Sequence, residues 1–192
     1  MLAFDPKDYI DTKTIKVKLG YGTEPLIVCS TGGTSVGKEL LSLCADAYPL
    51  VKEKIPNLKM VIACGPHVDP NYIHAVEGLE VKGYVPQLFE HFAAADLCIV
   101  TGGGTTTLEL ITLNKAFLYF PLLKHFEQQR DVAWKCERLN AGIKMNYATT
   151  SKEVLAKAIQ ENIGKKVNYP SVPIDGAQKA AELINEFLDH QT

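Results

Sequence analysis

Residues 84–109 read YVPQLFEHFAAADLCIVTGGGTTTLE, and the second half of this stretch decides the fold. Residues 96–100 predict a buried strand, a loop of glycines and threonines follows, and a helix begins near residue 105. Glycines allow the main chain to approach phosphate oxygens, and the free N–H groups at a helix start face negative charge. Glu109, one turn into this helix, can accept hydrogen bonds from vicinal hydroxyls such as those of a ribose. The stretch therefore predicts a nucleotide site.

Strands and helices alternate from residue 25 onward. Because the strands are apolar on both faces and helices separate them, we expect an α/β fold with a Rossmann-like, doubly wound parallel sheet in a single domain. Such a sheet binds ligands at the carboxyl ends of its strands, where the glycine-rich loops fall. The strands are predicted at 26–30, 58–64, 80–83, 96–100, 116–120 and 143–146, and the helices at about 38–54, 86–94, 105–113, 125–139, 152–163 and 176–189.

The chain has 192 residues, a length that fits one domain. Residues 1–24 are polar, and we interpret them as a lead-in or linker with a short strand at 15–19. Residues 25–192 form the predicted binding domain.

Composition excludes several classes of function. The formal net charge of −2 does not favour binding to nucleic acid, and no apolar run is long enough to cross a bilayer. The five cysteines are irregularly spaced without a Cys-x-x-Cys pair, which indicates neither a zinc site nor a disulfide framework. No histidines have metal-ligand spacing, so we expect no metal site. A reducing cytoplasm fits this cysteine usage best.

The first glycine loop, residues 30–38, has three interpretations. Gly32, Gly37 and Lys38 match the spacing of a P-loop, but Glu39 stands where a magnesium-binding Ser or Thr is needed. A second interpretation is a tight turn that only serves helix–sheet packing. We favour a glycine loop of another kind, which faces a phosphate or an acceptor. A dinucleotide site is disfavoured because the Gly-x-Gly-x-x-Gly pattern is missing.

Two further segments offer candidate ligand groups. Tyr84 can stack on a flat base while the main chain of Val85 reads its edge; the alternative is a buried tyrosine at the end of a strand. Glu127 and Gln128 can bind sugar hydroxyls; the alternative is an ordinary acidic helix start. Trp134, in a helical stretch, is expected in the core.

Residues 84–128 together resemble the donor-binding half of the GT-B nucleotide-sugar glycosyltransferases, and above all the UDP-glycosyltransferase signature region. The resemblance covers most of residues 25–163. It rests on the Tyr84-Val85-Pro86-Gln87 motif, His91, the 101–109 loop, Pro121 and the Glu127-Gln128 pair. The first loop and Gln128-Gln129 also resemble those of the bacterial N-acetylglucosaminyltransferases of peptidoglycan synthesis.

The resemblance implies a role for each motif. The segment containing Tyr84, Val85 and Gln87 would hold uracil, and Glu109 would bind the ribose. Glu127 and Gln128 would bind the sugar, and Gly33 and Thr34 would lie near the phosphate or the acceptor. The diphosphate would be held, without metal or cofactor, by Gly103, Gly104, Thr105 and Thr106.

Two departures from the family pattern are Thr101, where many relatives have His, and Asp131, where many have Asn. The resemblance implies an inverting transfer of a hexose or N-acetylhexosamine from a UDP-sugar. The acceptor site and the unassigned catalytic base would lie in another domain or a partner chain, as in the two-chain enzyme that extends a dolichol-linked sugar. We therefore expect no turnover from this chain alone. Membrane association would come through the missing half or a lipid-linked acceptor.

Three alternatives remain open at this point. A UDP-sugar 2-epimerase shares the fold, although we assign no acid–base residues for it. A P-loop or dinucleotide-binding protein is a second alternative. A non-catalytic module that binds a nucleotide sugar is the third.

Overall fold

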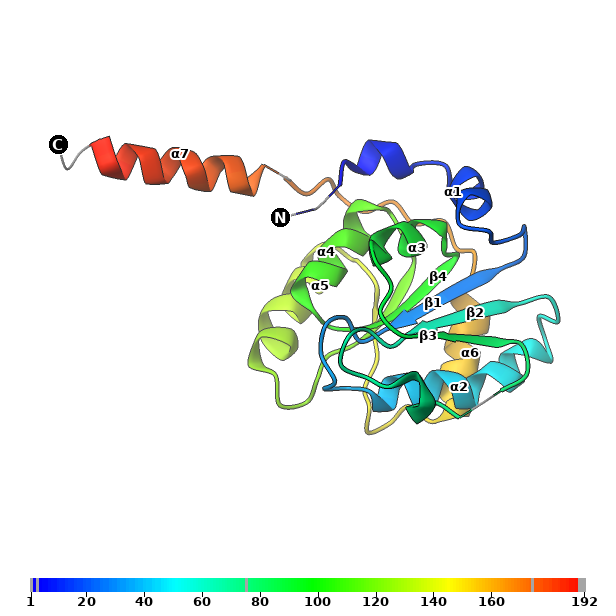
Figure 1. The fold of residues 1–192 in the computed structure, drawn as a ribbon. Coiled ribbons are helices and arrows are strands. Elements are labelled where there is room, and N and C mark those ends of the chain that lie inside the picture. Colours follow the sequence, from blue (N-terminus) through cyan, green and yellow to red (C-terminus); the bar gives the residue numbers. More distant parts are fainter. Residues whose placement is uncertain (1, 3, 75, 174, 190–192) are drawn as a thin grey trace.

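The computed structural model describes residues 2, 4–74, 76–173 and 175–189. Within them, six parallel strands form one sheet in the order β3-β2-β1-β4-β5-β6 (Figure 1). The chain reverses its direction of winding between β1 and β4, which is where ligands bind in open parallel sheets. The strands are β1 (Leu26–Ser30), β2 (Lys59–Ala63), β3 (Leu79–Lys82), β4 (Leu97–Thr101), β5 (Phe117–Phe120) and β6 (Ile143–Lys144).

Helices cover both faces of the sheet, as the predicted doubly wound fold requires. α2 (Glu39–Lys52) and α6 (Lys152–Asn162) pack together on one face, where residues such as Leu40 and Leu155 join the core. α3 (Leu88–Ala94), α4 (Gly104–Thr112) and α5 (Ala133–Arg138) lie on the other (Figure 1). Every residue of β1 and β4 is buried, which explains their unbroken apolar sequences.

The lead-in differs from the expectation. The predicted strand at 15–19 is wrong, because this segment belongs to helix α1 (Thr12–Lys18), which follows the short helix η1 (Pro6–Tyr9). Asp11 caps α1, since its Oδ1 accepts a hydrogen bond from the Lys13 N–H at 3.0 Å. Ile15 is buried and α1 packs against α3, so the helix joins the core of the domain.

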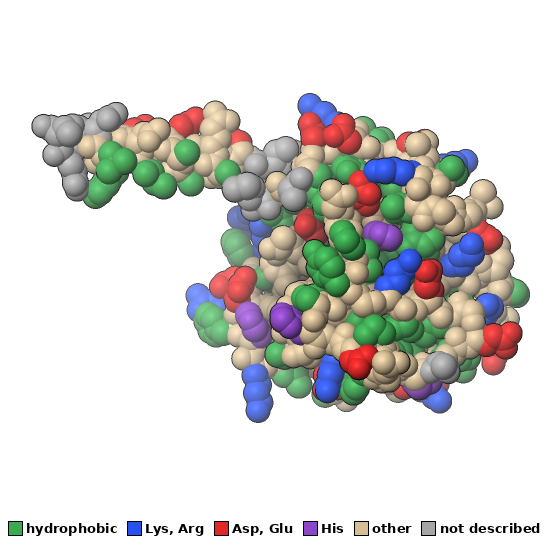
Figure 2. Space-filling view, in the orientation of Figure 1, with side chains coloured by type: hydrophobic (Ala, Val, Ile, Leu, Met, Phe, Trp, Pro, Cys, Tyr) green, Lys and Arg blue, Asp and Glu red, His purple; other side chains and the backbone are tan. Residues whose placement is uncertain are grey.

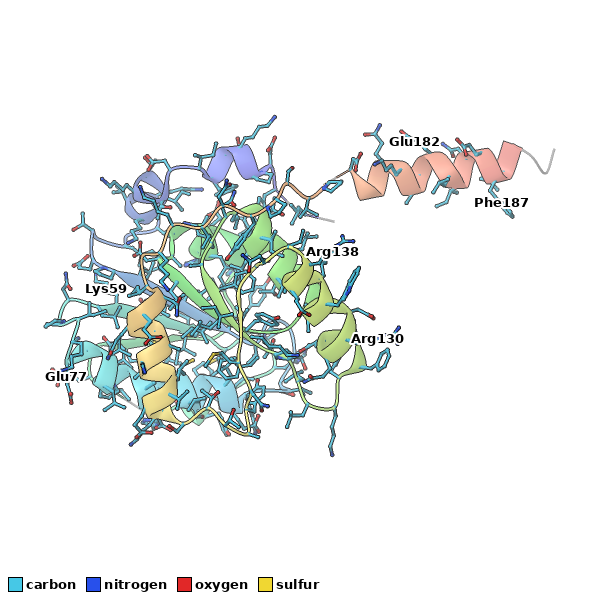
Figure 3. The ribbon with its side chains drawn as sticks, turned by 180° about the vertical axis from the view of Figure 1, so that it is seen from behind. Lys59, Glu77, Arg130, Arg138, Glu182 and Phe187 are labelled. Carbon is cyan, nitrogen blue, oxygen red and sulfur yellow. The ribbon has the colours of Figure 1, made fainter. Side chains whose placement is uncertain are left out.

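The helix predicted at 125–139 contains a π-helical turn, η3 (Gln128–Val132), before α5. Trp134 on α5 is not in the core, as we expected, but is 58% exposed. The guanidinium of Arg138 lies 4.7 Å from its ring centre, so a cation–π contact takes the place of core packing. Figure 3 shows Arg130 and Arg138 on this outer side of the molecule.

The last helix, α7 (Gly176–Asp189), extends away from the sheet (Figure 1). It is amphipathic, and its apolar side chains line one side (Figure 2). Glu182 and Phe187 point to opposite sides of it (Figure 3). Across the described ranges, no helix combines the length and the apolar character needed to span a membrane. The exposed apolar residues of α7 are Leu183, Ile184, Phe187 and Leu188.

Candidate functional site

The glycine-rich loops that follow β1 and β4 meet at the carboxyl edge of the sheet. The two strands are neighbours, so residues 70 positions apart come into contact: the Thr101 hydroxyl donates to the Thr31 carbonyl at 3.3 Å. Both threonines are buried. This bond fixes the two loops against each other and forms the floor of the candidate site.

The start of α4 lies at Gly104, one residue before the helix start predicted from the sequence. Gly103 is the extended N-cap residue, and no side chain caps the helix. The Thr107 hydroxyl turns back to the carbonyls of Gly103 and Gly104 at 3.0 and 3.2 Å. The N–H groups of the first helical turn, including those of Thr105 and Thr106, have no intrahelical partner and carry the positive end of the helix dipole.

The first loop faces this helix start across a narrow space. A Cβ built on Gly32 would lie 3.9 Å from the Thr106 hydroxyl oxygen, and one on Gly103 would lie 4.0 Å from the same atom. Gly33 is exposed, with open space where a side chain would be. The Thr34 hydroxyl oxygen accepts from the Val36 N–H at 3.1 Å, which forms a turn within the loop. Loop and helix together therefore border a space lined by main-chain N–H groups and threonine hydroxyls, which we call the cradle.

Glu109 is half-buried on α4, and its carboxylate has no hydrogen-bond or ion-pair partner among the residues that the structure describes. Burial raises the pKa of this carboxyl group above its ordinary value. Among the described residues, nothing occupies the hydrogen-bonding capacity of this carboxylate, which lies one turn into α4.

Tyr84 is 67% exposed, so the alternative of a buried tyrosine is wrong. Tyr84 and Val85 lie in the connection between β3 and α3. The exposed Gln87 has a left-handed backbone with φ of 49°, and α3 therefore begins at Leu88, two residues later than predicted. The exposed ring leaves a flat aromatic face open to a base.

Glu127 and Gln128 have different surroundings. Glu127 is exposed, and its carboxylate lies beside the start of α4. Gln128 is buried, and its Oε1 accepts from the Leu122 N–H at 3.0 Å. The side-chain carbonyl of Gln128 thus fixes the loop after β5. The side-chain amide nitrogen of Gln128 has no hydrogen-bond partner within the described ranges.

The structure does not favour the P-loop interpretation of the first loop. The Lys38 ammonium lies 4.3 Å from the centre of the Tyr72 ring, on the short helix η2 (Pro70–Tyr72), instead of curling over its own loop. The described residues also include no group of three or more His, Cys, Asp or Glu side chains placed to hold a metal ion.

An apolar cavity of about 530 Å³ adjoins the cradle and was not predicted. It lies between the first loop and the segment after β5, and Tyr147 lines it from the chain that follows β6. The Tyr147 hydroxyl is buried without a hydrogen-bond partner in the part of the chain described. The sequence gives one indication of this cavity: Tyr147 follows the strand predicted at 143–146, whose carboxyl end lies at the same edge of the sheet as the cradle. The lining residues are Val36, Gly37, Glu39, Leu122, Leu123, Lys124, His125 and Tyr147.

Known proteins share both the sequence pattern and the fold. The model of the glycosyltransferase family 28 C-terminal domain matches residues 27–187. An uncharacterized glycosyltransferase of Methanosarcina mazei is 30% identical over 102 residues, which are 53% of this chain and 27% of that protein. The UDP-N-acetylglucosamine–N-acetylmuramyl-(pentapeptide) pyrophosphoryl-undecaprenol N-acetylglucosamine transferase of Janthinobacterium is 31% identical over 144 residues, 71% of this chain and 39% of that one.

Solved structures show the same architecture. MurG of Acinetobacter baumannii aligns with a TM-score of 0.56 at 18% identity, over 80% of this chain and 45% of its own. WaaG, a glycosyltransferase of lipopolysaccharide biosynthesis, aligns with a TM-score of 0.63 at 17% identity, over 81% of this chain and 42% of its own.

The chain spans only 27% of the length of the Methanosarcina protein and 39% of the Janthinobacterium enzyme. It matches one Rossmann-like half of the GT-B fold, and the family model covers most of its length. The chain belongs to the glycosyltransferase family 28 C-terminal domain family.

Proposed function

We propose that this chain binds a UDP-sugar and serves as the donor half of an inverting, metal-independent glycosyltransferase. The observation that carries the proposal is the start of α4, which no side chain caps, with Gly32 across from Thr106. Glu109 stands one turn further on and has no partner among the residues that the structure describes. The cradle supplies donors for a diphosphate, and the carboxylate supplies acceptors for ribose hydroxyls.

The exposed Tyr84 ring would stack on uracil, with Val85 and Gln87 beside the base. Glu127 and the free amide nitrogen of Gln128 would take the hydroxyls of a hexose or N-acetylhexosamine; the Janthinobacterium relative transfers N-acetylglucosamine by its name. In the transfer, the acceptor oxygen bonds to the anomeric carbon as the bond to UDP breaks. The helix start and the threonine hydroxyls would stabilise the charge that develops on the departing diphosphate.

The acceptor would approach through the cavity beside the cradle, whose apolar lining suits an acceptor with a hydrocarbon part, such as a lipid-linked sugar. The base that takes the acceptor proton would belong to the rest of the enzyme, since this chain spans less than half of its relatives. In this proposal the chain alone binds the donor but does not turn it over.

Calorimetric titration tests the donor assignment. We expect UDP and a UDP-sugar to bind in the presence of EDTA, and ATP and NAD to bind much more weakly. Glu109→Gln should lose about tenfold in affinity, because a neutral amide accepts ribose hydroxyls less strongly than a carboxylate does. Glu77→Gln, an exposed residue in the turn before β3, removes the same charge far from the cradle and is the matched control.

The P-loop and dinucleotide alternatives each have their own result in this titration, and a transfer assay tests the non-catalytic module. Binding of ATP that requires magnesium would support a P-loop protein, and NAD binding would support a dinucleotide site. Equal UDP affinity in Glu109→Gln and in wild type would contradict the placement of the ribose. Sugar transfer by the mixture of this chain with its acceptor half, but by neither alone, would exclude a purely non-catalytic module.

A further inference from the structure

A second cavity lies at the opposite, amino end of the strands, away from the candidate donor site. Its volume is about 650 Å³, within the range of small-molecule sites. It is bounded by α1, by the residues just before β4 and β5, and by the segment after α6. The lining residues are Thr12, Lys13, Lys16, Val17, Gly22, Thr23, Ala95, Asp96, Asn114, Lys115, Ala116, Gly164, Lys165, Lys166 and Val167.

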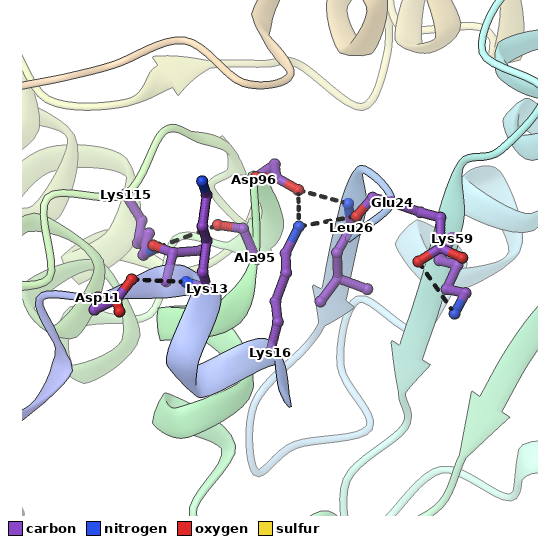
Figure 4. Close-up of polar contacts among 10 residues, drawn as sticks. Asp11, Lys13, Lys16, Glu24, Leu26, Lys59, Ala95, Asp96 and Lys115 are labelled. Atoms are coloured by element: carbon purple, nitrogen blue, oxygen red, sulfur yellow. Dashed lines mark hydrogen bonds and ion pairs between the residues drawn. The ribbon is translucent and has the colours of Figure 1, made fainter. Parts of the chain in front are cut away.

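The charge of this lining is unlike that of the chain as a whole. Five of the lining residues are lysines and one is an aspartate, an excess of four positive charges in a chain of net charge −2. The aspartate is already used: Asp96 Oδ2 lies 2.6 Å from the Lys16 ammonium and accepts from the Leu26 N–H at 2.7 Å (Figure 4). The other four lysines are left without a carboxylate in the lining.

Lys115 is the strongest sign that this cavity binds an anion. Its side chain is buried, with 9% of the residue exposed, and its ammonium donates to the Thr12 hydroxyl at 2.7 Å and to the Ala95 carbonyl at 3.3 Å (Figure 4). Both partners are neutral, no carboxylate pairs with it within the described residues, and one of its three N–H donors is unused. A buried ammonium without a counter-charge is costly.

Three exposed lysines extend this charge to the mouth of the cavity. Lys13 stands on α1, and Lys165 and Lys166 follow α6 on the other side. None of them makes an ion pair within the described ranges. Asp11, next to α1, has its carboxylate committed to the Lys13 N–H and the Thr14 hydroxyl. An anion in the mouth of the cavity would therefore lie between Lys13 on one side and Lys165 and Lys166 on the other.

We propose that this cavity, the basic pocket, binds a phosphate-bearing ligand. A phosphate group has the charge to offset several lysines, and its oxygens can accept from ammonium groups on different segments at once. The ligand is either a soluble phosphorylated compound or the headgroup of an anionic phospholipid, since both present this chemistry. The pocket is separate from the donor cradle, so the chain holds two phosphate sites at opposite ends of one sheet.

Amide chemical shifts provide a readout for each site separately. We expect pyrophosphate, added in the presence of saturating UDP, to shift the amides of residues 95–96 and 164–167, with the effect weakening as salt is added. The Lys13→Met/Lys166→Met variant should lose roughly tenfold in affinity at these amides. Lys54→Met/Lys152→Met removes two exposed lysines elsewhere and is the charge-matched control.

Lys115→Met separates binding from a purely structural role of this lysine. If Lys115 only attaches α1, Lys115→Met will lower the free energy of unfolding, and Lys13→Met/Lys166→Met will bind pyrophosphate as tightly as wild type. These two results together would show that the proposal is wrong. Vesicles of phosphatidylcholine with and without phosphatidic acid identify the source: sedimentation with the acidic vesicles that is lost in Lys13→Met/Lys166→Met indicates a headgroup. Pyrophosphate shifts without vesicle binding indicate a soluble ligand. If neither probe binds, the basic pocket is not a site, whatever the outcome at the donor cradle.

Discussion

A carboxylate oxygen of Glu127 lies close to Gly104: a Cβ built on Gly104 would come within 3.1 Å of Glu127 Oε1, so the carboxylate would have to shift to admit a side chain there. Gly104 begins α4, and Glu127 precedes the π-helical turn. The residue proposed to bind the sugar therefore lies beside the helix start proposed to bind the diphosphate. This proximity places the two proposed halves of the donor site next to each other.

Gly104→Ala should weaken sugar binding without damage to the fold. Alanine is the better helix former, so the free energy of unfolding should change by less than about 1 kcal/mol, while the new methyl displaces Glu127. We expect the affinity for a UDP-sugar to fall by about tenfold and that for UDP by less. Calorimetry of both ligands measures the difference. Gly176→Ala, at the start of α7 with open space around it, should change neither affinity.

The raised pKa of Glu109 should make donor binding dependent on pH. Burial favours the protonated form in the folded protein, so the contribution of this group to stability is present at low pH and is lost as pH rises through its folded pKa. Donor binding has the opposite sign, because the ribose needs the ionised carboxylate. The affinity for a UDP-sugar, whose diphosphate does not titrate in this range, should rise through the same pKa. Glu109→Gln should flatten this profile and slightly raise stability at neutral pH; an unchanged profile in the variant would assign the titration to another group.

Tyr84 should contribute to binding but hardly to stability, because 67% of it is exposed. Loss of a base–aromatic stack costs about 1–3 kcal/mol, so Tyr84→Ala should lose at least about fivefold in UDP affinity while Tyr84→Phe keeps most of it. Both variants should unfold within about 0.5 kcal/mol of wild type. Trp134→Ala, another exposed aromatic, should bind UDP normally; an equal loss in Tyr84→Phe would argue for the hydroxyl instead of the ring.

Asp96→Asn should be strongly destabilising. The side chain of Asp96 is only 26% exposed and that of Lys16 only 8%, so the variant leaves a buried ammonium without its partner. Removal of one partner from such a pair costs roughly 3 kcal/mol, measurable by urea unfolding. The double variant Asp96→Asn/Lys16→Met should recover part of this loss. Asp46→Asn, whose carboxylate is half exposed, should have little effect; equal losses at Asp46 and Asp96 would contradict the importance of burial here.

The sequence predicted most of the architecture because local pattern and tertiary environment agree in the sheet. The unbroken apolar run of β1 was predicted at its observed bounds, Leu26–Ser30, since a central parallel strand is buried on both faces. The segment from Asp96 to Glu109 was predicted as strand, loop and helix start, within one residue of the observed bounds of β4 and α4, because one continuous stretch encodes all three.

The errors arose where distant residues decide the local structure. Residues 15–19 alternate between apolar and basic side chains, as a strand would, but Asp11 caps a helix there and Lys16 pairs with Asp96, 80 positions away. Trp134 is a large apolar residue of the kind expected in a core, yet it lies at the surface, where its ring contacts the guanidinium of Arg138. The basic pocket was not predicted because its lysines come from three separate parts of the chain, which only the fold brings together.

Strand β4 connects the two ends of the sheet, with Asp96 just before it and Thr101 at its end. Five residues of strand span about 16 Å, roughly twice the Debye length of about 8 Å at physiological ionic strength. The exposed lysines at one end therefore contribute little to the electrostatic potential that a diphosphate meets at the other. The binding free energies of ligands at the two ends should therefore be additive. Any cooperativity between them would require a displacement of β4, a strand that is packed on both faces.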